Sequence, residues 1–494
     1  MNTKQLRQKI LDLAICGKLV PQDPNDEPAS MLLERIQEEK KRLVREKIIK
    51  QAKNTAYSMK KDYYSQHQKL PIGWELCSLG DVCLDFQYGT SQKSDKSGEI
   101  AVLRMGNLQN GEVDYTDLAF SSDEGDIEKY LLNEGELLFN RTNSPEWVGK
   151  TSIYRGDIPA IFAGYIIRVA PIFIDPHYLN YAMNSDYHRA MCQQAKTDGV
   201  NQSNINAQKL SRFVYPLPPL AEQHRIVAAI ISTFAIIDEI ERNKADLQAA
   251  VTAAKQKILS LAVQGKLVPQ DPNDEPAEAI LTRIATKKER LLKDGKMRKG
   301  KKTNNSINEE DTKNHFIPSG WALARLEGIC QLITDGTHQT PKYADDGFIF
   351  LSSKNVKSGK IDWDNVMYTP QELHDVLYAR LAPEIGDVLL AKNGTTGFAA
   401  VVDRDCIFDI YVSLALIRTF KEEISPQFLR HIISSEVVQS HFRGNLKGIG
   451  VPNLHLEHIR SAIIPVCSLA EQHRIVEAVE LAFEQLDIIS KSLS

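Results

Sequence analysis

The segment GKLVPQDPNDEPA occupies residues 17–29 and is repeated without change at residues 265–277. It lies inside a longer match, because residues 8–36 and 256–284 share 22 of 29 residues. Ordinary composition would give about two identities by chance over this length. A match of this size at a fixed offset indicates a tandem duplication within the chain.

Further matches extend the duplication through the chain. LAEQHRIV at 220–227 recurs at 469–476, and LPIGWELCSLGDVC at 70–83 is similar to IPSGWALARLEGIC at 317–330. The offsets are all close to 249, while the segments between the matching blocks differ. The pattern predicts two divergent domains, each followed by a shared helical block.

The shared block after Pro216 has apolar residues at alternating spacings of three and four, with Lys244 as the one polar member. This spacing is typical of a long helix with one apolar seam. A helix over 220–264 would be about 68 Å long. We expect Gly265 to end it, and a Pro/Asp-rich turn to precede a shorter helix from Ala277. The seam residues are Ile237, Ile240, Leu247, Val251, Ala254, Ile258 and Leu261.

The C-terminal copy stops close to where the N-terminal copy begins. At the repeat offsets, Ser494 aligns with position 245 of the central helix and Met1 aligns with position 249. The two terminal helices together would therefore rebuild the central helix with three residues missing. We predict a pseudo-twofold internal repeat with circular permutation, long antiparallel coiled-coil helices separating two similar domains, and neighbouring termini.

The two variable blocks contain short apolar runs such as AIFAGYIIRVAPI and IYVSLALI, broken by Gly, Asn and Pro. These runs predict strands with a few helices, and hence an α/β (α+β) fold class. Residues 295–315, between the central helical block and the second variable block, contain almost no large apolar residue, so we expect them to be exposed or poorly ordered. The predicted regions are 1–69 (N-terminal helical), 70–216 (first variable domain), 217–293 (central helical), 294–316 (flexible linker), 317–465 (second variable domain) and 466–494 (C-terminal helix).

Composition limits the class of protein. The chain has 494 residues, 60 basic and 64 acidic, so its net charge is −4 and it is no bulk polycation. A local basic face can still bind DNA. The seven cysteines include no CxxC pair, which is typical of a reducing compartment. The chain has no apolar run approaching 18 residues and no cleavable signal, so we predict a cytoplasmic protein without a membrane segment.

No catalytic motif emerges from the sequence. Gly149-Lys150-Thr151 has the ending of a phosphate-binding loop, but Ser144 stands where its first glycine should be. No dinucleotide-binding glycine fingerprint and no metal-ligand spacing of His or Cys is present. We therefore predict no catalytic residue and no metal site.

The order of LAEQHRIV, GKLVPQDPNDEPA and LPxGW resembles that of the specificity subunits of type I restriction-modification enzymes. ITDGTHQTPKY (333–343), GDVLLAKNGTTG (386–397) and QYGTSQKSD (87–95) are similar to that family's target-recognition motifs. The resemblance implies that the variable domains are target recognition domains, each binding one half of a bipartite double-stranded DNA target.

The resemblance also implies partners. The conserved helices of this family dock two methyltransferase subunits and, through them, restriction/translocase subunits. The chain itself would then be a non-catalytic subunit of a restriction and adenine methyltransferase complex. It would bind no cofactor, and S-adenosylmethionine, ATP and Mg would belong to the partner subunits.

Candidate contact residues follow from side-chain chemistry. Arg and Lys read guanine, Asn and Gln read adenine, and Lys, Thr and Ser hold phosphates, although Asn and Thr in loops also form turns. The DNA-binding candidates are Arg104, Asn107, Arg141, Thr142, Asn143, Asn201, Gln202, Ser203 and Asn204 in the first domain, and Thr337, His338, Lys342, Lys354, Asn355, Lys392, Asn393, Thr395, Lys447 and Asn453 in the second. The partner-docking candidates are the repeated EQHR steps, Glu222, Gln223, His224 and Arg225 with Glu471, Gln472, His473 and Arg474.

Two alternatives remain open at this point. The chain could be a stand-alone DNA-binding regulator, or a coiled-coil adaptor without nucleic acid. Shared helical blocks suit two copies of one partner, and divergent domains suit two different half-sites. This combination favours the DNA-reading scaffold.

Overall fold

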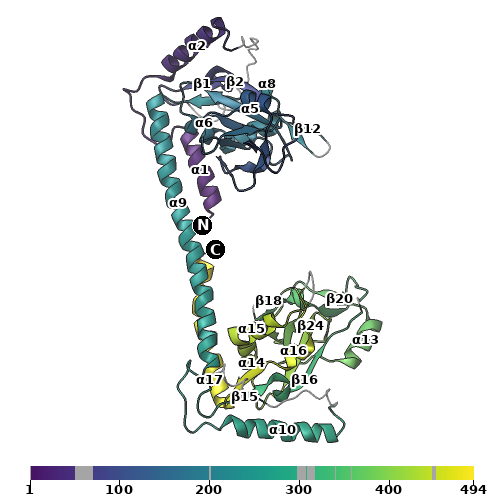
Figure 1. The fold of residues 1–494 in the computed structure, drawn as a ribbon. Helices are drawn as coiled ribbons and strands as arrows, with labels where there is room; N and C mark the ends of the chain where they lie inside the picture. The colour runs from purple at the N-terminus through teal and green to yellow at the C-terminus, as the bar shows by residue number, and fades with distance from the viewer. Residues whose placement is uncertain are drawn as a thin grey trace. The chain divides into compact units, whose positions relative to one another are not determined.

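The computed structural model describes residues 2–49, 70–199, 202–297, 307–308, 317–339, 341–357, 359–447 and 452–493. They form two compact units, Met1–Asn243 and Lys244–Ser494, and the boundary falls inside helix α9 (Leu220–Val263) (Figure 1). Most of the predicted linker 294–316 lies outside the described residues. The finer division of the chain therefore stays a prediction.

Unit 1 contains two helical segments around a domain of short strands and helices. Its elements are α1 (Thr3–Ile15), α2 (Ala29–Arg45), β1 (Glu75–Ser78), α4 (Leu79–Val82), β2 (Cys83–Tyr88), β3 (Ile100–Leu103), η1 (Met105–Asn107), β4 (Leu108–Gln109), β5 (Glu112–Val113), β6 (Ala119–Ser121), α5 (Glu124–Tyr130), β7 (Leu137–Asn140), β8 (Thr142–Asn143), β9 (Thr151–Ile153), β10 (Ala160–Phe162), β11 (Ile166–Pro171), α6 (Pro176–Ala182), α7 (Asp186–Ala195), β12 (Thr197–Asp198), β13 (Ser203–Asn204), α8 (Ala207–Leu210), β14 (Val214–Leu217) and the first part of α9.

Unit 2 repeats this order. Its elements are the second part of α9, α10 (Ala277–Lys293), β15 (Ala322–Arg325), α12 (Leu326–Ile329), β16 (Cys330–Asp335), β17 (Phe348–Leu351), η2 (Ser353–Asn355), β18 (Val356–Lys357), β19 (Lys360–Ile361), β20 (Met367–Thr369), α13 (Gln371–Arg380), β21 (Val388–Ala391), β22 (Ala399–Val401), β23 (Phe408–Ile410), β24 (Leu414–Thr419), α14 (Pro426–Ile433), α15 (Glu436–Gly444), α16 (Leu456–Arg460), β25 (Ile463–Val466) and α17 (Leu469–Ser492).

Two of the larger sheets have matching strand orders in the two units. The four-stranded sheet has the order β2-β11-β7-β9 in unit 1 and β16-β24-β21-β22 in unit 2. The three-stranded sheets, β10-β3-β6 and β20-β17-β23, each contain one parallel pair, β3 with β10 and β17 with β23. The mixed α+β class and the internal repeat are therefore confirmed.

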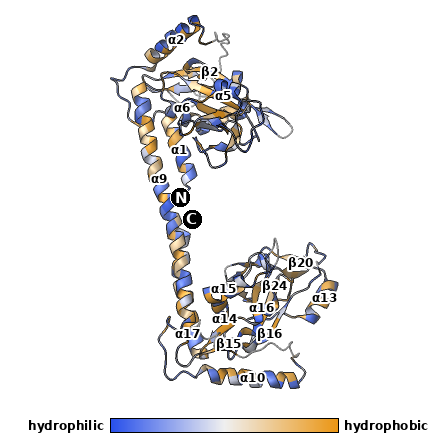
Figure 2. Ribbon diagram, in the orientation of Figure 1, coloured by the Kyte–Doolittle hydropathy of each residue, from blue (hydrophilic) through white to orange (hydrophobic). Residues whose placement is uncertain are grey.

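The middle strands of the four-stranded sheets are mostly apolar because both faces are covered. In β7, Leu137 and Phe139 pack into one core cluster, and Leu138 packs into another on the opposite face. In β21, Val388 and Leu389 divide between two clusters in the same way. Each of these buried side chains contributes about 1.5–3 kcal/mol of hydrophobic stabilisation. Figure 2 shows hydrophobic residues concentrated in the strands of both units.

Glycine ends the helix before the repeated turn in both units, as predicted for Gly265. Gly17 has φ +64° and Gly265 has φ +62°, the left-handed conformation that favours glycine after a helix. A Cβ at Gly17 would lie 2.4 Å from Cγ of Pro71, and one at Gly265 would lie 2.5 Å from Cγ of Pro318. The absence of a side chain therefore lets the start of each variable domain pack closely against the helix end.

An antiparallel helix pair holds each unit together, and the same contacts recur in both. In unit 1, Arg7 of α1 pairs with Asp238 of α9 at 2.5 Å and lies over the Phe234 ring. In unit 2, Lys255 of α9 pairs with Asp487 of α17 at 2.5 Å, and its ammonium lies over the Phe483 ring. The N-terminal helix therefore takes, in unit 1, the role that the second part of α9 takes in unit 2. This equivalence supports the predicted circular permutation.

The predicted apolar seam is only partly buried. Ile237 and Val251 are 1% and 7% exposed, whereas Ile240 and Leu247 are 38% and 42% exposed within the described residues. Helix α9 is long and apolar enough, by length and composition alone, to span a membrane. In unit 1 the apolar residues of α9 are explained by packing, because Ile237 belongs to a core cluster with residues of α1.

Candidate nucleic-acid interface

Two asparagines that the sequence suggested as base readers are structural. Asn107 is 3% exposed; its oxygen accepts from the Arg104 amide at 2.8 Å, and its nitrogen donates to the carbonyls of Asp114 and Asp117. Asn355 is 5% exposed and makes the matching set of bonds to backbone groups in unit 2. These amides close a turn. A direct DNA contact by Asn107 and Asn355 stays a prediction that these bonds do not support.

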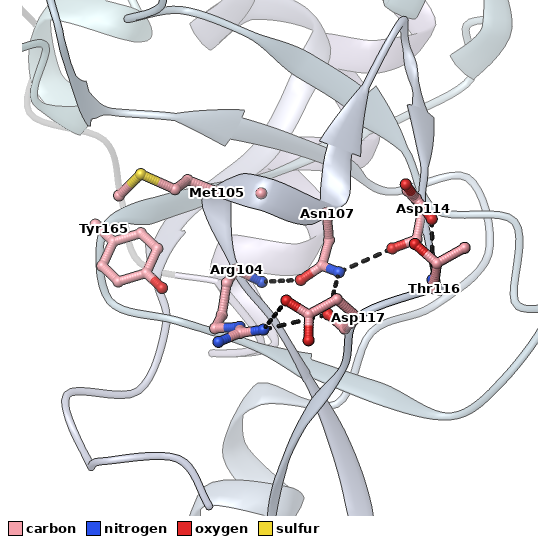
Figure 3. Close-up of a pocket in the computed structure, with 8 residues that line it drawn as sticks. Arg104, Met105, Asn107, Asp114, Thr116, Asp117 and Tyr165 are labelled. Atoms are coloured by element: carbon pink, nitrogen blue, oxygen red, sulfur yellow. Dashed lines mark hydrogen bonds and ion pairs between the residues drawn. The ribbon is translucent and has the colours of Figure 1, made fainter. Parts of the chain in front are cut away.

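Arg104 lines an open hollow of about 300 Å³ beside this turn (Figure 3). Its guanidinium donates to the carboxylate of Asp117 at 3.0 Å, and Tyr165 forms part of the same wall. The Asp117 side chain is 91% exposed, so this ion pair faces solvent. The pair can open to give the Arg104 fork to a base edge or a phosphate at little energetic cost.

Arg141 stands between this hollow and a small ribbon of strands. Its backbone amide donates to the carbonyl of Tyr165, and its guanidinium lies 4.6 Å from the Tyr88 ring centroid. Thr142 follows on β8, where its hydroxyl accepts from the side chain of Asn204 at 2.9 Å. Arg141 therefore links a residue that lines the hollow, Tyr165, to the first strand of the ribbon in the chain.

The ribbon β12-β13-β8 carries the other first-domain candidates. Asn143 pairs with Ser203 across β8 and β13, and Ser203 is fully buried and donates to Asp198. Ser203 therefore supports the ribbon from within, and its role as a DNA contact stays a prediction that its burial does not support. Gln202 is exposed near the ribbon tip. Asn201 lies outside the described residues.

In unit 2 a single carboxylate organises the corresponding loop. Asp335 is 7% exposed; it pairs with Lys392 at 2.5 Å and lies 3.4 Å from His338. Arg380 at the end of α13 donates to the carbonyls of Asp335 and Gly336. Lys392 is itself only 5% exposed, so its burial does not support the prediction of a direct DNA contact, which stays a prediction. Its buried charge instead fixes the loop that presents the exposed His338.

The remaining second-domain candidates converge on the same loop cluster. Thr395 donates to the carbonyl of Ser353 at 3.1 Å, and Asn393 accepts from the Ser353 hydroxyl at 3.3 Å. Asn393 and Lys447 both form a β-bridge with Asn453, the counterpart of the unit 1 ribbon. Lys342 and Lys354 are exposed. Thr337 is 9% exposed, and its hydroxyl accepts from the Gln339 amide.

Sequence reasoning missed Asp335, Arg380 and Tyr88. Aligning the two halves through GELLFNRT and GDVLLAKN places Arg141 opposite Lys392, and the preceding strands place Tyr88 opposite Asp335. The pair Arg141 and Tyr88 of unit 1 therefore occupies the same positions as the pair Lys392 and Asp335 of unit 2. The alignment could have identified these two pairs, although not whether they read bases or support a loop.

The EQHR steps, predicted as docking residues, mostly bind their own unit. Glu222 is 1% exposed and accepts from the indole of Trp74 at 2.8 Å, while Gln223 is fully buried and accepts from the amide of Asp175. Arg225 pairs with Asp26 at 2.5 Å. The same contacts recur at Glu471, Gln472 and Arg474. The Glu and Gln side chains of both steps are buried, whereas His224 and His473 are exposed. The docking role of the EQHR steps stays a prediction.

Comparison with known proteins identifies the class. A family model described as the type I restriction modification DNA specificity domain matches residues 71–248 and 318–493. The chain is 27% identical to the EcoAI specificity subunit of Escherichia coli, over 97% of this chain and 88% of that protein, and 26% identical to the EcoEI specificity subunit, over 99% and 90%. A solved type I R-M system structure matches with a TM-score of 0.55 at 17% identity, covering 86% of this chain and 94% of that one.

The chain belongs to the type I restriction modification DNA specificity family, whose domain it contains twice. Its function is that of a type I restriction-modification specificity subunit. The structural likeness shows the same overall fold. Among the described residues, no three His, Cys, Asp or Glu side chains are grouped as a metal site requires.

Proposed function

We propose that the two recognition domains, 70–216 and 317–465, each bind one half of a bipartite double-stranded DNA target. The observation that carries this proposal is a shared scaffold with different side chains at matched loop positions. Thr142 in the first domain corresponds to Asn393 in the second. A common fold gives both domains the same approach to DNA, while different side chains give different half-sites.

The chemistry of the loops suits DNA reading. Arg104 and Arg141 present planar forks that can bind two acceptors of guanine, and Gln202 can bind two atoms of adenine in the major groove. Lys342 and Lys354 are exposed cations of unit 2, and together with the exposed His338 they suit phosphate oxygens, which position the protein without specifying sequence. The chain supplies recognition and carries out no bond-breaking step.

The partners we propose are two methyltransferase subunits and, through them, restriction/translocase subunits. Such partners would bring S-adenosylmethionine, ATP and Mg and would methylate adenine, whereas this chain holds no cofactor. We place the complex in the cytoplasm, away from membranes. A stand-alone regulator would differ by binding its full target without these subunits, and a coiled-coil adaptor would not bind DNA.

Selection from random duplexes tests the proposal. The full chain with its methyltransferase subunits should enrich two short specified sequences separated by a fixed number of unspecified base pairs. Equal enrichment by the chain alone would favour the regulator. Enrichment of a single half-site, or of none, would contradict bipartite reading.

A further inference from the structure

A glutamine follows a Gly-Thr step at the same place in both recognition domains. Residues 89–92 are GTSQ, and residues 336–339 are GTHQ. Gln92 and Gln339 are both exposed, whereas the exposed position before them holds Ser91 in one domain and His338 in the other. A side chain that recurs on an exposed loop of two divergent domains needs a physical reason.

The Gly-Thr step fixes the backbone of this loop in the same way in both units. A Cβ on the glycine would overlap the carbonyl oxygen of Phe162 in unit 1 and that of Ile410 in unit 2, so only glycine fits. The threonine amide donates to the same oxygen, at 2.9 Å in unit 1 and 3.1 Å in unit 2. The threonine hydroxyl then accepts from the glutamine amide, at 2.9 Å and 3.3 Å. Each glutamine therefore leaves an equivalent, fixed turn.

The glutamine side chains themselves are free. Within the part of the chain that the structure describes, neither the Gln92 nor the Gln339 side-chain amide has a hydrogen-bond partner. The amides of Asn107 and Asn355, by contrast, donate to backbone carbonyls. An exposed amide bonded only to water can exchange that water for a ligand at little cost in free energy. The two glutamines are therefore available for binding.

The fixed turn lies next to the candidate cations of each domain. In unit 1, Tyr88 precedes the Gly-Thr step and lies 4.6 Å from the guanidinium of Arg141. Arg141 also donates to the carbonyl of Gly164 at 3.4 Å, and the Gly164 amide donates to the threonine carbonyl of the step at 2.6 Å. In unit 2, Asp335 precedes the step and pairs with Lys392 at 2.5 Å. The glutamines therefore belong to the same loop clusters as these cations.

Other exposed residues that recur at matched positions have a structural explanation. Glu124 and Glu372 lie in the first turns of α5 and α13, where a carboxylate stabilises the helix dipole. Asp157 and Asp405 lie in the turns before β10 and β23, and aspartate is a common turn residue. These carboxylates also repel phosphates. The uncharged, unbonded glutamine pair has neither explanation.

The chemistry of the side chain indicates the base that it would bind. A glutamine amide presents one acceptor and one donor side by side. In the major groove, adenine offers the complementary pair, a donor at N6 beside an acceptor at N7, whereas guanine offers two acceptors. Phosphate oxygens only accept, and cationic side chains suit them better. A recurring amide therefore suits a recurring adenine.

We infer that Gln92 and Gln339 each read an adenine, at equivalent positions of the two half-sites. This inference rests on the proposed function and adds to it the residues that read a base common to both halves. The side chains that differ between the domains then read the bases that differ between the half-sites.

The test uses the full chain with the methyltransferase subunits of its own system and duplexes selected from a random pool. Both selected half-sites should contain an adenine at an equivalent position. Gln92→Ala should lower the preference for this adenine over the other bases about tenfold in the half-site read by residues 70–216, and leave the other half-site unchanged. Gln339→Ala should have the reverse effect. Binding to a panel of single-base variants measures both preferences.

A modified base tests the contact at the level of atoms. Replacing this adenine with 7-deazaadenine removes the N7 acceptor and keeps the N6 amino group. The unaltered chain should bind the modified duplex about fivefold more weakly, because one hydrogen bond is lost. Gln92→Ala should bind the modified and unmodified duplexes equally when the change is in its own half-site, and should still show the loss when it is in the other.

A matched control is Gln37→Ala, because Gln37 is an exposed glutamine of α2 and the matched position of unit 2 already holds Ala285. It should change neither preference, and circular dichroism checks that all variants fold. Half-sites without a common adenine, or a Gln92→Ala variant that binds every duplex equally more weakly, would overturn the inference while the proposed function stands. A selection that returns no bipartite target would overturn both.

Discussion

The indole nitrogen of Trp74 donates a 2.8 Å hydrogen bond to Glu222, and both side chains are buried. Trp321 makes the same bond to Glu471 at 2.9 Å in unit 2. The bond joins the first residues of each recognition domain to the first turn of the helix that follows the domain. It therefore closes each domain on itself and fixes the direction in which the long helix leaves.

Replacing Trp74 with Phe should lower the free energy of unfolding of unit 1 by about 1–3 kcal/mol, because the buried Glu222 carboxylate loses a donor. Urea unfolding of the full chain measures the effect. Trp147, which is 50% exposed, provides the control. Trp147→Phe should change the unfolding free energy by less than about 0.5 kcal/mol. Equal effects of the two substitutions would argue against a structural role for the Trp74 bond.

The pair formed by Asp335 and Lys392 predicts a non-additive result. Asp335→Asn should destabilise unit 2 by about 3–5 kcal/mol, because it leaves the buried Lys392 ammonium without a counter-charge. Adding Lys392→Met should recover most of this loss, since no unpaired charge remains. The double variant should still bind DNA more weakly, because His338 loses its fixed loop. Full recovery of DNA binding in filter-binding measurements would show that Asp335 does not position the loop.

Alanine substitutions at Arg104 and at Asn107, three residues apart, should have opposite effects on DNA specificity and on stability. Arg104→Ala should leave stability nearly unchanged, since its ion pair with Asp117 is exposed, but it should relax discrimination at one base pair by about 1–3 kcal/mol. Asn107→Ala should destabilise the domain by about 1–3 kcal/mol, because two buried carbonyls lose their donor. Thermal unfolding and binding to a panel of single-base variants separate the two effects. A specificity change in a fully stable Asn107→Ala variant would refute the structural assignment.

Burial lowers the pKa of His188 from 6.5 to about 4. Below pH 6.5 the unfolded chain takes up a proton on this ring that the folded chain does not, so stability is lost as the pH falls from 6.5 toward 4. Between pH 7 and pH 5 the loss from His188 should be about 2 kcal/mol. Urea unfolding at both pH values measures the loss, and His188→Gln should reduce the pH dependence by this amount. An unchanged pH dependence in that variant would mean that His188 is not the titrating group.

The repeat explains why so much of the fold could be predicted. The identical turns and the matching LPxGW segments fix the equivalence of the units, and the matching contacts of α1 and of the second part of α9 support the permutation. The seam was predicted less well, because spacing shows which residues share a face of a helix but not whether a neighbour covers it. Ile237 and Ile240 lie on that face, yet only Ile237 is buried.

The candidate site could be predicted by region but not by residue. Loops rich in Asn, Lys and Thr contact one another in each domain, as the Asn204–Thr142 and Ser353–Asn393 bonds show, and their role in DNA binding stays a prediction. The same side chains that read bases also close turns and pair with buried charges, as Asn355 and Lys392 do. That choice depends on contacts between segments far apart in the chain, which residue types alone do not reveal.

The central claim is that each domain reads its own half of the target. Replacing residues 70–216 with the corresponding domain of another specificity subunit, then mapping methylated adenines in DNA treated by the assembled complex, tests this claim most directly. We expect one half of the target to change, and the other half and partner binding to stay the same. A change in both halves, or in neither, would contradict the account.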